Sequence, residues 1–88
     1  MAAVLTADVL QDELAVQFAR IVAAANRRAV ELGVDLSWSL VSVTQTTLDN
    51  PFWRINYGPK DYLLKRGGDV IIDVDPIDAS VKQVLRGQ

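Results

Sequence analysis

Two segments in the second half of the chain alternate between apolar and polar residues, as half-buried strands do. They are Phe52–Tyr57 and Asp69–Val74, and a loop with Gly-Pro at one end and Gly-Gly at the other joins them. Because residues two apart along a strand share a face, the apolar faces carry Trp53, Ile55, Tyr57, Val70, Ile72 and Val74. The opposite faces carry Phe52, Arg54, Asn56, Ile71 and Asp73. The pattern predicts a long-looped hairpin at the centre of a small antiparallel sheet.

The first third of the chain has a helical period. Asp8 is placed to cap the helix, with Gln11 completing a capping-box-like pair, and Gly33 suits the left-handed position that follows a helix. We expect one amphipathic helix of about 25 residues, close to 37 Å long. Its apolar stripe is Leu10, Leu14, Phe18, Ile21, Ala25, Ala29 and Leu32. The alanines predict close packing on the sheet, and the expected core is Leu14, Phe18 and Ile21 against Trp53, Ile55 and Ile72.

Two further segments complete the sheet. Ser37–Thr47 is rich in β-branched residues, but its apolar phase changes near Leu40, which indicates either a bulge or burial on both faces. Val81–Arg86 follows an Asp-Pro turn and reads either as a strand paired with Asp69–Val74 or as a short helix capped by Asp78. We favour the strand, because an isolated helix of about eight residues is marginal.

These elements predict one α+β domain over residues 1–88. A long N-terminal helix lies on a three- or four-stranded antiparallel meander. A chain of 88 residues is long enough for one core and too short for two.

Composition narrows the chemistry. The chain has no cysteine and no histidine, which removes thiolate ligands, the usual metal-binding imidazole and the usual general base near neutral pH. We therefore expect no enzyme activity, no cofactor and no metal. The aspartates at 69, 73, 75 and 78 do not have the spacing of a calcium loop. Alternation instead predicts a solvated edge, with Asp73 and Asp75 together on the solvent side.

The formal net charge is −2, with nine Lys and Arg against eleven Asp and Glu. This balance offers no general attraction to phosphate backbones or anionic lipids, so we expect neither a nucleic-acid partner nor a membrane. The first twenty residues lack the basic start of a signal peptide, and no apolar run is long enough to cross a bilayer. The sequence predicts a cytoplasmic protein.

The order of motifs resembles a known family. A helix is followed by Trp53-Arg54-Ile55, then by Gly67-Gly68-Asp69, then by a strand that ends in Val74-Asp75-Pro76 and resumes at Val81. This order is similar to PepSY-like domains and to small bacterial immunity proteins with cystatin-like folds. The resemblance implies a non-catalytic domain that binds or inhibits another protein. Members typically follow a pattern like VDPxTGxV, and Ala79 stands where the pattern has glycine, which suggests a different turn.

The face of the hairpin that points away from the helix is the predicted docking surface for a partner protein or a second copy. It mixes an aromatic, an aliphatic and opposite charges, as interface cores with polar rims do. The predicted partner-binding residues are Phe52, Arg54, Tyr62, Arg66, Ile71 and Asp73. Two alternatives stay open: a small-ligand site in the hollow between helix and curved sheet, and a self-associating structural subunit that uses the alanine-rich helix.

Overall fold

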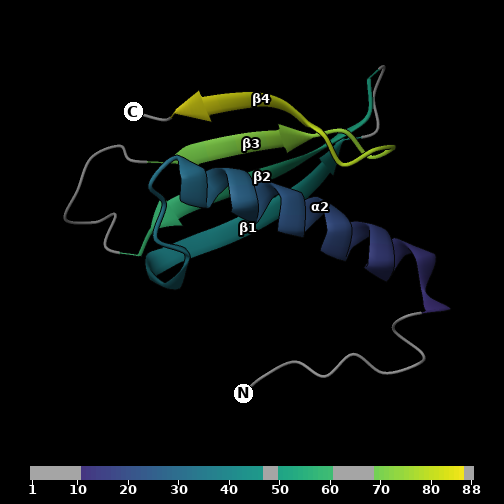
Figure 1. Cartoon of the computed structure of the whole chain (residues 1–88), viewed down its shortest axis with the longest axis horizontal. Coiled ribbons are helices and arrows are strands. Elements are labelled where there is room, and N and C mark those ends of the chain that lie inside the picture. The colour runs from purple at the N-terminus through teal and green to yellow at the C-terminus, as the bar shows by residue number, and fades with distance from the viewer. Residues whose placement is uncertain (1–10, 47–49, 61–68, 87–88) are drawn as a thin grey trace.

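The computed structural model describes residues 11–46, 50–60 and 69–86. Within these ranges, the helix α2 (Glu13–Glu31) precedes a four-stranded antiparallel sheet with strand order β1-β2-β3-β4. The strands are β1 (Ser39–Thr46), β2 (Phe52–Pro59), β3 (Val70–Val74) and β4 (Val81–Arg86), and a short 3-10 turn, η1 (Leu36–Trp38), leads into β1. The helix lies across one face of the sheet (Figure 1). The predicted α+β meander is confirmed.

The helix begins later than predicted. Asp12 has an extended backbone, with φ −86° and ψ 107°, and its carboxylate accepts a 3.0 Å hydrogen bond from the Ala15 N–H. An aspartate with an extended backbone and this hydrogen bond is the N-cap of a helix, so α2 begins after Asp12 and not after Asp8. Asp8 itself lies outside the described residues. At the other end, Gly33 has φ +91°, as predicted for the residue after the helix.

The central part of α2 makes the helix side of the core. Ile21, Ala25 and Ala29 are at most 1% exposed, so the prediction of close alanine packing is confirmed for the last two. Leu14 and Phe18 are 57% and 41% exposed, which makes their predicted burial wrong. The purple N-terminal end of α2 lies away from the strands, whereas its C-terminal half crosses them (Figure 1).

The two central strands supply the other half of the core. Their alternation is as predicted, and every residue on the apolar face is buried: Trp53, Ile55, Tyr57, Val70, Ile72 and Val74. Ile55 stands opposite Ile72 in the β2–β3 register, and both are 0% exposed. β2 continues through Gly58 and Pro59, so the predicted loop starts later than expected, and Gly67-Gly68 lies outside the described residues.

The outer strands differ from one another. β1 pairs with β2 along its whole length without a register shift, and Leu40 and Val41, on opposite faces, are 52% and 45% exposed. Neither the bulge nor the burial on both faces occurs, because β1 is an edge strand that α2 does not cover. β4 is a strand, as favoured, and the irregularity lies there instead, opposite Asp73 and Val74.

The turn between β3 and β4 holds an alanine in an unusual conformation. Ala79 has φ +58°, a region that glycine adopts at little cost and other residues rarely enter. The carboxylates of Asp75 and Asp78 accept hydrogen bonds from the N–H groups of Ile77 and Ser80, at 2.7 and 2.9 Å, and the bonds with Ser80 lower the pKa of Asp78. The alanine was expected to give a different turn from the one that glycine forms in the family pattern. Instead, Ala79 adopts the positive φ that glycine would adopt at this position.

We expect Ala79→Gly to stabilise the protein by roughly 0.5–1 kcal/mol, because it relieves the left-handed conformation of an L residue at some cost in chain entropy. Urea melts of the variant and the parent measure the difference. The matched control is Ala23→Gly on the exposed side of α2, which should destabilise by about 1 kcal/mol. Equal losses at both positions would contradict the positive φ at Ala79.

A second prediction concerns Tyr57. Its hydroxyl donates a 2.6 Å hydrogen bond to Asn26 Oδ1 under the helix, and burial raises the pKa of Tyr57 from 10.0 to about 12. Because the folded-state pKa lies above the unfolded value, the stabilisation is fully present below pH 10 and is lost as the pH rises toward 12. We expect the free energy of unfolding to fall by about 2 kcal/mol over this interval.

Tyr57→Phe supplies the control, because other groups also titrate at alkaline pH. The variant should start about 1 kcal/mol less stable at neutral pH and should lack the part of the alkaline loss that belongs to Tyr57. Identical pH profiles for the two proteins would show that Tyr57 ionises as an exposed tyrosine does.

Candidate functional site

The face of the sheet opposite α2, here called the outer face, is uncovered by any helix in the part of the chain that the structure describes (Figure 1). Its side chains come from all four strands, because residues that stand opposite one another in antiparallel pairs point to the same side. The register places these residues there: Leu40, Ser42, Thr44, Thr46, Phe52, Arg54, Asn56, Ile71, Asp73, Gln83 and Leu85.

An ion pair occupies the middle of the outer face. Arg54 and Asp73 are opposite each other in the β2–β3 register. The Nε and Nη2 atoms of Arg54 donate hydrogen bonds to Oδ1 and Oδ2 of Asp73, at 2.8 and 3.0 Å. Gln83 Nε2 on β4 donates a third, at 3.1 Å, to Oδ2. The arrangement is the bidentate fork that guanidinium and carboxylate groups favour.

Asp73 is only 4% exposed, so its predicted place on a solvated edge is wrong. β3 lies between β2 and β4, and the side chains of both neighbours enclose the carboxylate. The hydrogen bond to Asp73 raises the pKa of Arg54 above its usual value, and the two bonds of the fork hold the guanidinium in one orientation.

Phe52 completes a cluster at one end of the outer face. The Arg54 guanidinium carbon lies 5.3 Å from the centre of its ring, and Lys82 Nζ lies 5.9 Å from it. Both distances are within the range of cation–π attraction. We call these residues the Phe52 cluster: Phe52, Arg54, Asp73, Lys82 and Gln83. They surround a shallow hollow of about 350 Å³ together with Asn50.

Ile71 is not part of this cluster. It pairs with Asn56, which is four residues along β2 from Phe52, and the Arg54–Asp73 pair lies between. Four strand residues span about 13 Å, so Phe52 and Ile71 do not form one contiguous apolar patch. Ile71 stands opposite Leu85 instead, and Leu85 is 37% exposed.

The structure thus brings together three of the six predicted partner-binding residues, places Ile71 apart on the same face, and leaves Tyr62 and Arg66 outside the described residues. Lys82 and Gln83 were missed. Gln83 stands opposite Asp73 in the regular part of the β3–β4 pairing, whereas Lys82 comes near Phe52 at the register shift opposite Asp73 and Val74. A strand pattern alone sends neighbouring residues to opposite faces, so only the cross-strand pairing reveals them.

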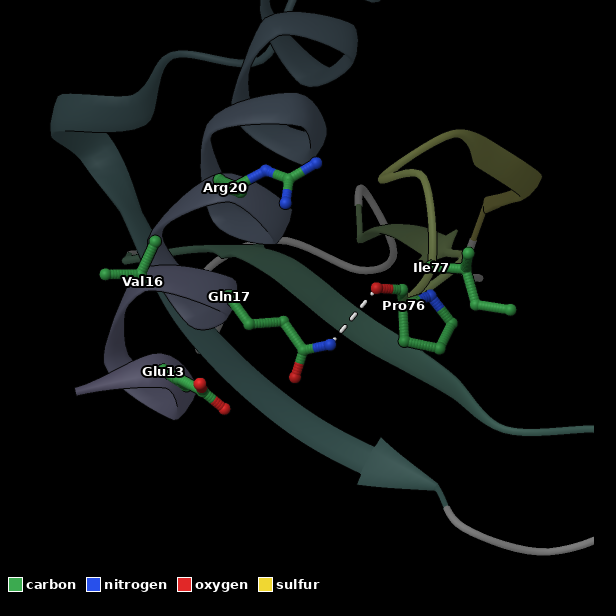
Figure 2. A pocket seen from close by; sticks show the side chains of 6 residues that line it. All are labelled: Glu13, Val16, Gln17, Arg20, Pro76 and Ile77. Carbon is green, nitrogen blue, oxygen red and sulfur yellow. Dashed lines mark hydrogen bonds between the residues drawn. The ribbon is translucent and has the colours of Figure 1, made fainter. Parts of the chain in front are cut away.

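A second hollow lies beside the helix (Figure 2). It has a volume of about 480 Å³ and is lined by Glu13, Val16, Gln17, Arg20, Pro76 and Ile77. Gln17 Nε2 donates a 3.1 Å hydrogen bond to the Pro76 carbonyl across it. A hollow was predicted between the helix and the sheet, but Ile21 and Ala25 fill the space over the central strands. The hollow observed here lies at the edge of the helix–sheet interface instead.

Residues 11–46, 50–60 and 69–86 contain no group of three or more acidic side chains that could hold a metal ion. Among the same residues, no helix combines the length and the apolar character needed to cross a bilayer.

Removing the guanidinium tests how much the ion pair matters. Arg54→Ala leaves Asp73 enclosed with Gln83 as its remaining partner, and we expect a loss of about 1–3 kcal/mol in urea melts at neutral pH. Arg28→Ala is the matched control, because it breaks a solvent-exposed pair with Glu31 that is worth about 0.5 kcal/mol or less. Equal small losses would mean that water reaches the Asp73 carboxylate.

Comparison with known proteins assigns this chain to no family. No protein-family model, no curated protein and no solved structure matches this chain. The resemblance to PepSY-like domains and cystatin-like immunity proteins therefore stays a prediction from short motifs.

Proposed function

We propose that this chain is a non-catalytic protein-binding domain that docks a partner protein on its outer face. The observation that carries the proposal is the Phe52 cluster, in which an aromatic ring and an Arg–Asp fork are held together on an uncovered sheet surface. Aromatic residues and arginine are the types most enriched at energetically dominant interface positions.

The cluster is ordered before any partner arrives. Arg54 makes two bonds to Asp73 and lies over Phe52, so few of its rotamers are left to lose. Immobilising a flexible side chain on binding costs about 0.5–1.5 kcal/mol, and this cost is largely met within the free domain. The polar rim of Thr44, Asn56 and Gln83 can exchange water for hydrogen bonds to a partner.

The resemblance supports a narrower version of the proposal. In this version the domain is a bacterial immunity or inhibitor protein that acts in the cytoplasm and binds its target without chemistry. The alternative from another class is a small-ligand-binding domain that uses the hollow beside α2 (Figure 2). Glu13, Gln17 and Arg20 favour it, because they offer both charges and an amide to a polar ligand.

The docking surface is tested by replacing Phe52 and Ile71 together with serine. Both are partly exposed, so the variant should keep the circular dichroism spectrum of the parent protein. The binding partner is first captured with the parent protein and purified. Its affinity for the variant should be at least about tenfold lower. The matched control removes two exposed apolar residues from the helix, Leu14→Ser with Val30→Ser, and should bind normally.

The possible outcomes distinguish docking on the outer face from docking on α2 and from small-ligand binding. A double variant that unfolds places Phe52 and Ile71 in the core. Unchanged binding by it, with loss in the helix control, moves the interface to α2. If no protein binds but a metabolite raises the melting temperature of the parent, the ligand-binding alternative is favoured.

A further inference from the structure

β1 is an open edge of the sheet. β2 occupies one side of this eight-residue strand, and in residues 11–46, 50–60 and 69–86 no segment pairs with the other side. In an antiparallel pair, alternate residues turn their N–H and C=O groups away from the partner strand. Roughly four residues of β1 therefore present unpaired backbone groups outward.

The two edges of the sheet are unequal. β4 carries Lys82 and Arg86, and its register is broken opposite Asp73 and Val74. Edge charges and bulges are the usual means by which proteins prevent unwanted strand pairing. The sequence of β1, SLVSVTQT, has no charge and no proline, and its register with β2 is regular. Among the described residues, only those of the β4 edge give such protection.

The surface beside the β1 edge is apolar on both faces. Leu40 on the outer face and Val41 on the helix face are 52% and 45% exposed, and Trp38, just before the strand, is 53% exposed. On the helix side, Phe18 packs edge-to-face on Trp53 of β2, with ring centres 5.6 Å apart, yet stays 41% exposed. Pairing at this edge would cover apolar area as well as backbone groups.

We propose that two copies of this chain associate through β1, which pairs antiparallel with β1 of a second copy and joins the two sheets into one of eight strands. Such pairing uses a two-fold axis perpendicular to the sheet and is self-complementary. A second copy suits this edge because the uncharged strand opposes no like charges when it meets itself.

The symmetry fixes the register to a few choices. Opposite residues in an antiparallel pair share a face, so a two-fold arrangement must place one residue opposite its own copy. We infer that this residue is Ser42, at the middle of the strand. Val41 then stands opposite Val43 of the second copy on the helix face, and the same contact repeats by symmetry. β-branched cross-strand pairs stabilise sheets.

The dimer would set the two outer faces side by side on one surface, because the axis keeps both helices on the same side. It does not depend on the proposed function, since β1 self-pairing uses the backbone edge of β1, whereas the Phe52 cluster lies on β2, β3 and β4. Loss of either activity by a variant leaves the other measurable.

The absence of cysteine allows a clean cross-linking test. Ser42→Cys should form a covalent dimer under mild oxidation, because directly opposite residues have Cα atoms about 4.5–5.5 Å apart, as disulfides require. Thr44→Cys is the control. It lies on the same face, but in this register the two copies of residue 44 are about 13 Å apart and should not cross-link. Equal cross-linking by both variants overturns the register.

Charge reversal tests the interface without cross-linking. Ser42→Glu and Ser42→Lys each place like charges at the axis, so each should weaken the dimer at least about tenfold, read as monomer mass in sedimentation equilibrium. An equimolar mixture should return to dimer mass, which a fold defect could not produce. A parent protein that is monomeric at every concentration, or variants that dimerise as the parent does, would overturn the proposal.

Discussion

The packing of one narrow helix stripe on two central strands is the constraint from which the other features follow. Ile21, Ala25 and Ala29 meet β2 and β3, and the small alanines bring the helix close to the sheet. A helix is about 10–12 Å wide and strands are about 4.8 Å apart, so one helix covers little more than two strands. In a sheet of four strands, the outer pair is left with partial cover at best.

This limit explains why β1 and the outer face carry the candidate binding surfaces. The interface between α2 and the two central strands is well buried. Among the described residues, no second helix covers the outer strands or the outer face. Groups at the edges and on the outer face then either bond to their neighbours or stay exposed to water, where another molecule can pair with them. β4 follows the first course, through its charges and its altered register, whereas β1 has the features that favour the second.

The Arg54–Asp73 fork satisfies a polar group on the outer face that has no helix above it. A carboxylate in the middle of a sheet loses much of its water, and an unpaired buried charge is costly. Two bonds from Arg54 and one from Gln83 replace that hydration. Because Arg54 is itself partly exposed, the pair stays at the surface, where a partner can reach it and the Phe52 ring beside it.

Local patterns in the sequence predicted the helix, the strands and the apolar faces of β2 and β3. Period-two alternation in β2 and β3 reports burial on one side of a strand, and that is a local property. For the same reason it identified Phe52, Arg54, Ile71 and Asp73 as residues of the opposite face. The position of Gly33 after the helix also followed from local backbone preference.

Which of these residues contact one another depends on how the helix and strands pack together. Leu14 and Phe18 fit the apolar stripe but are 57% and 41% exposed, although the Phe18 ring packs against Trp53 of β2. The pairing of Asp73 with Arg54 and Gln83 depends on the register of three strands, and the shift in β4 that brings Lys82 to Phe52 breaks the alternation on which strand patterns rely. Cross-strand register is set by packing between segments far apart in the chain, and a single sequence contains no local signal for it.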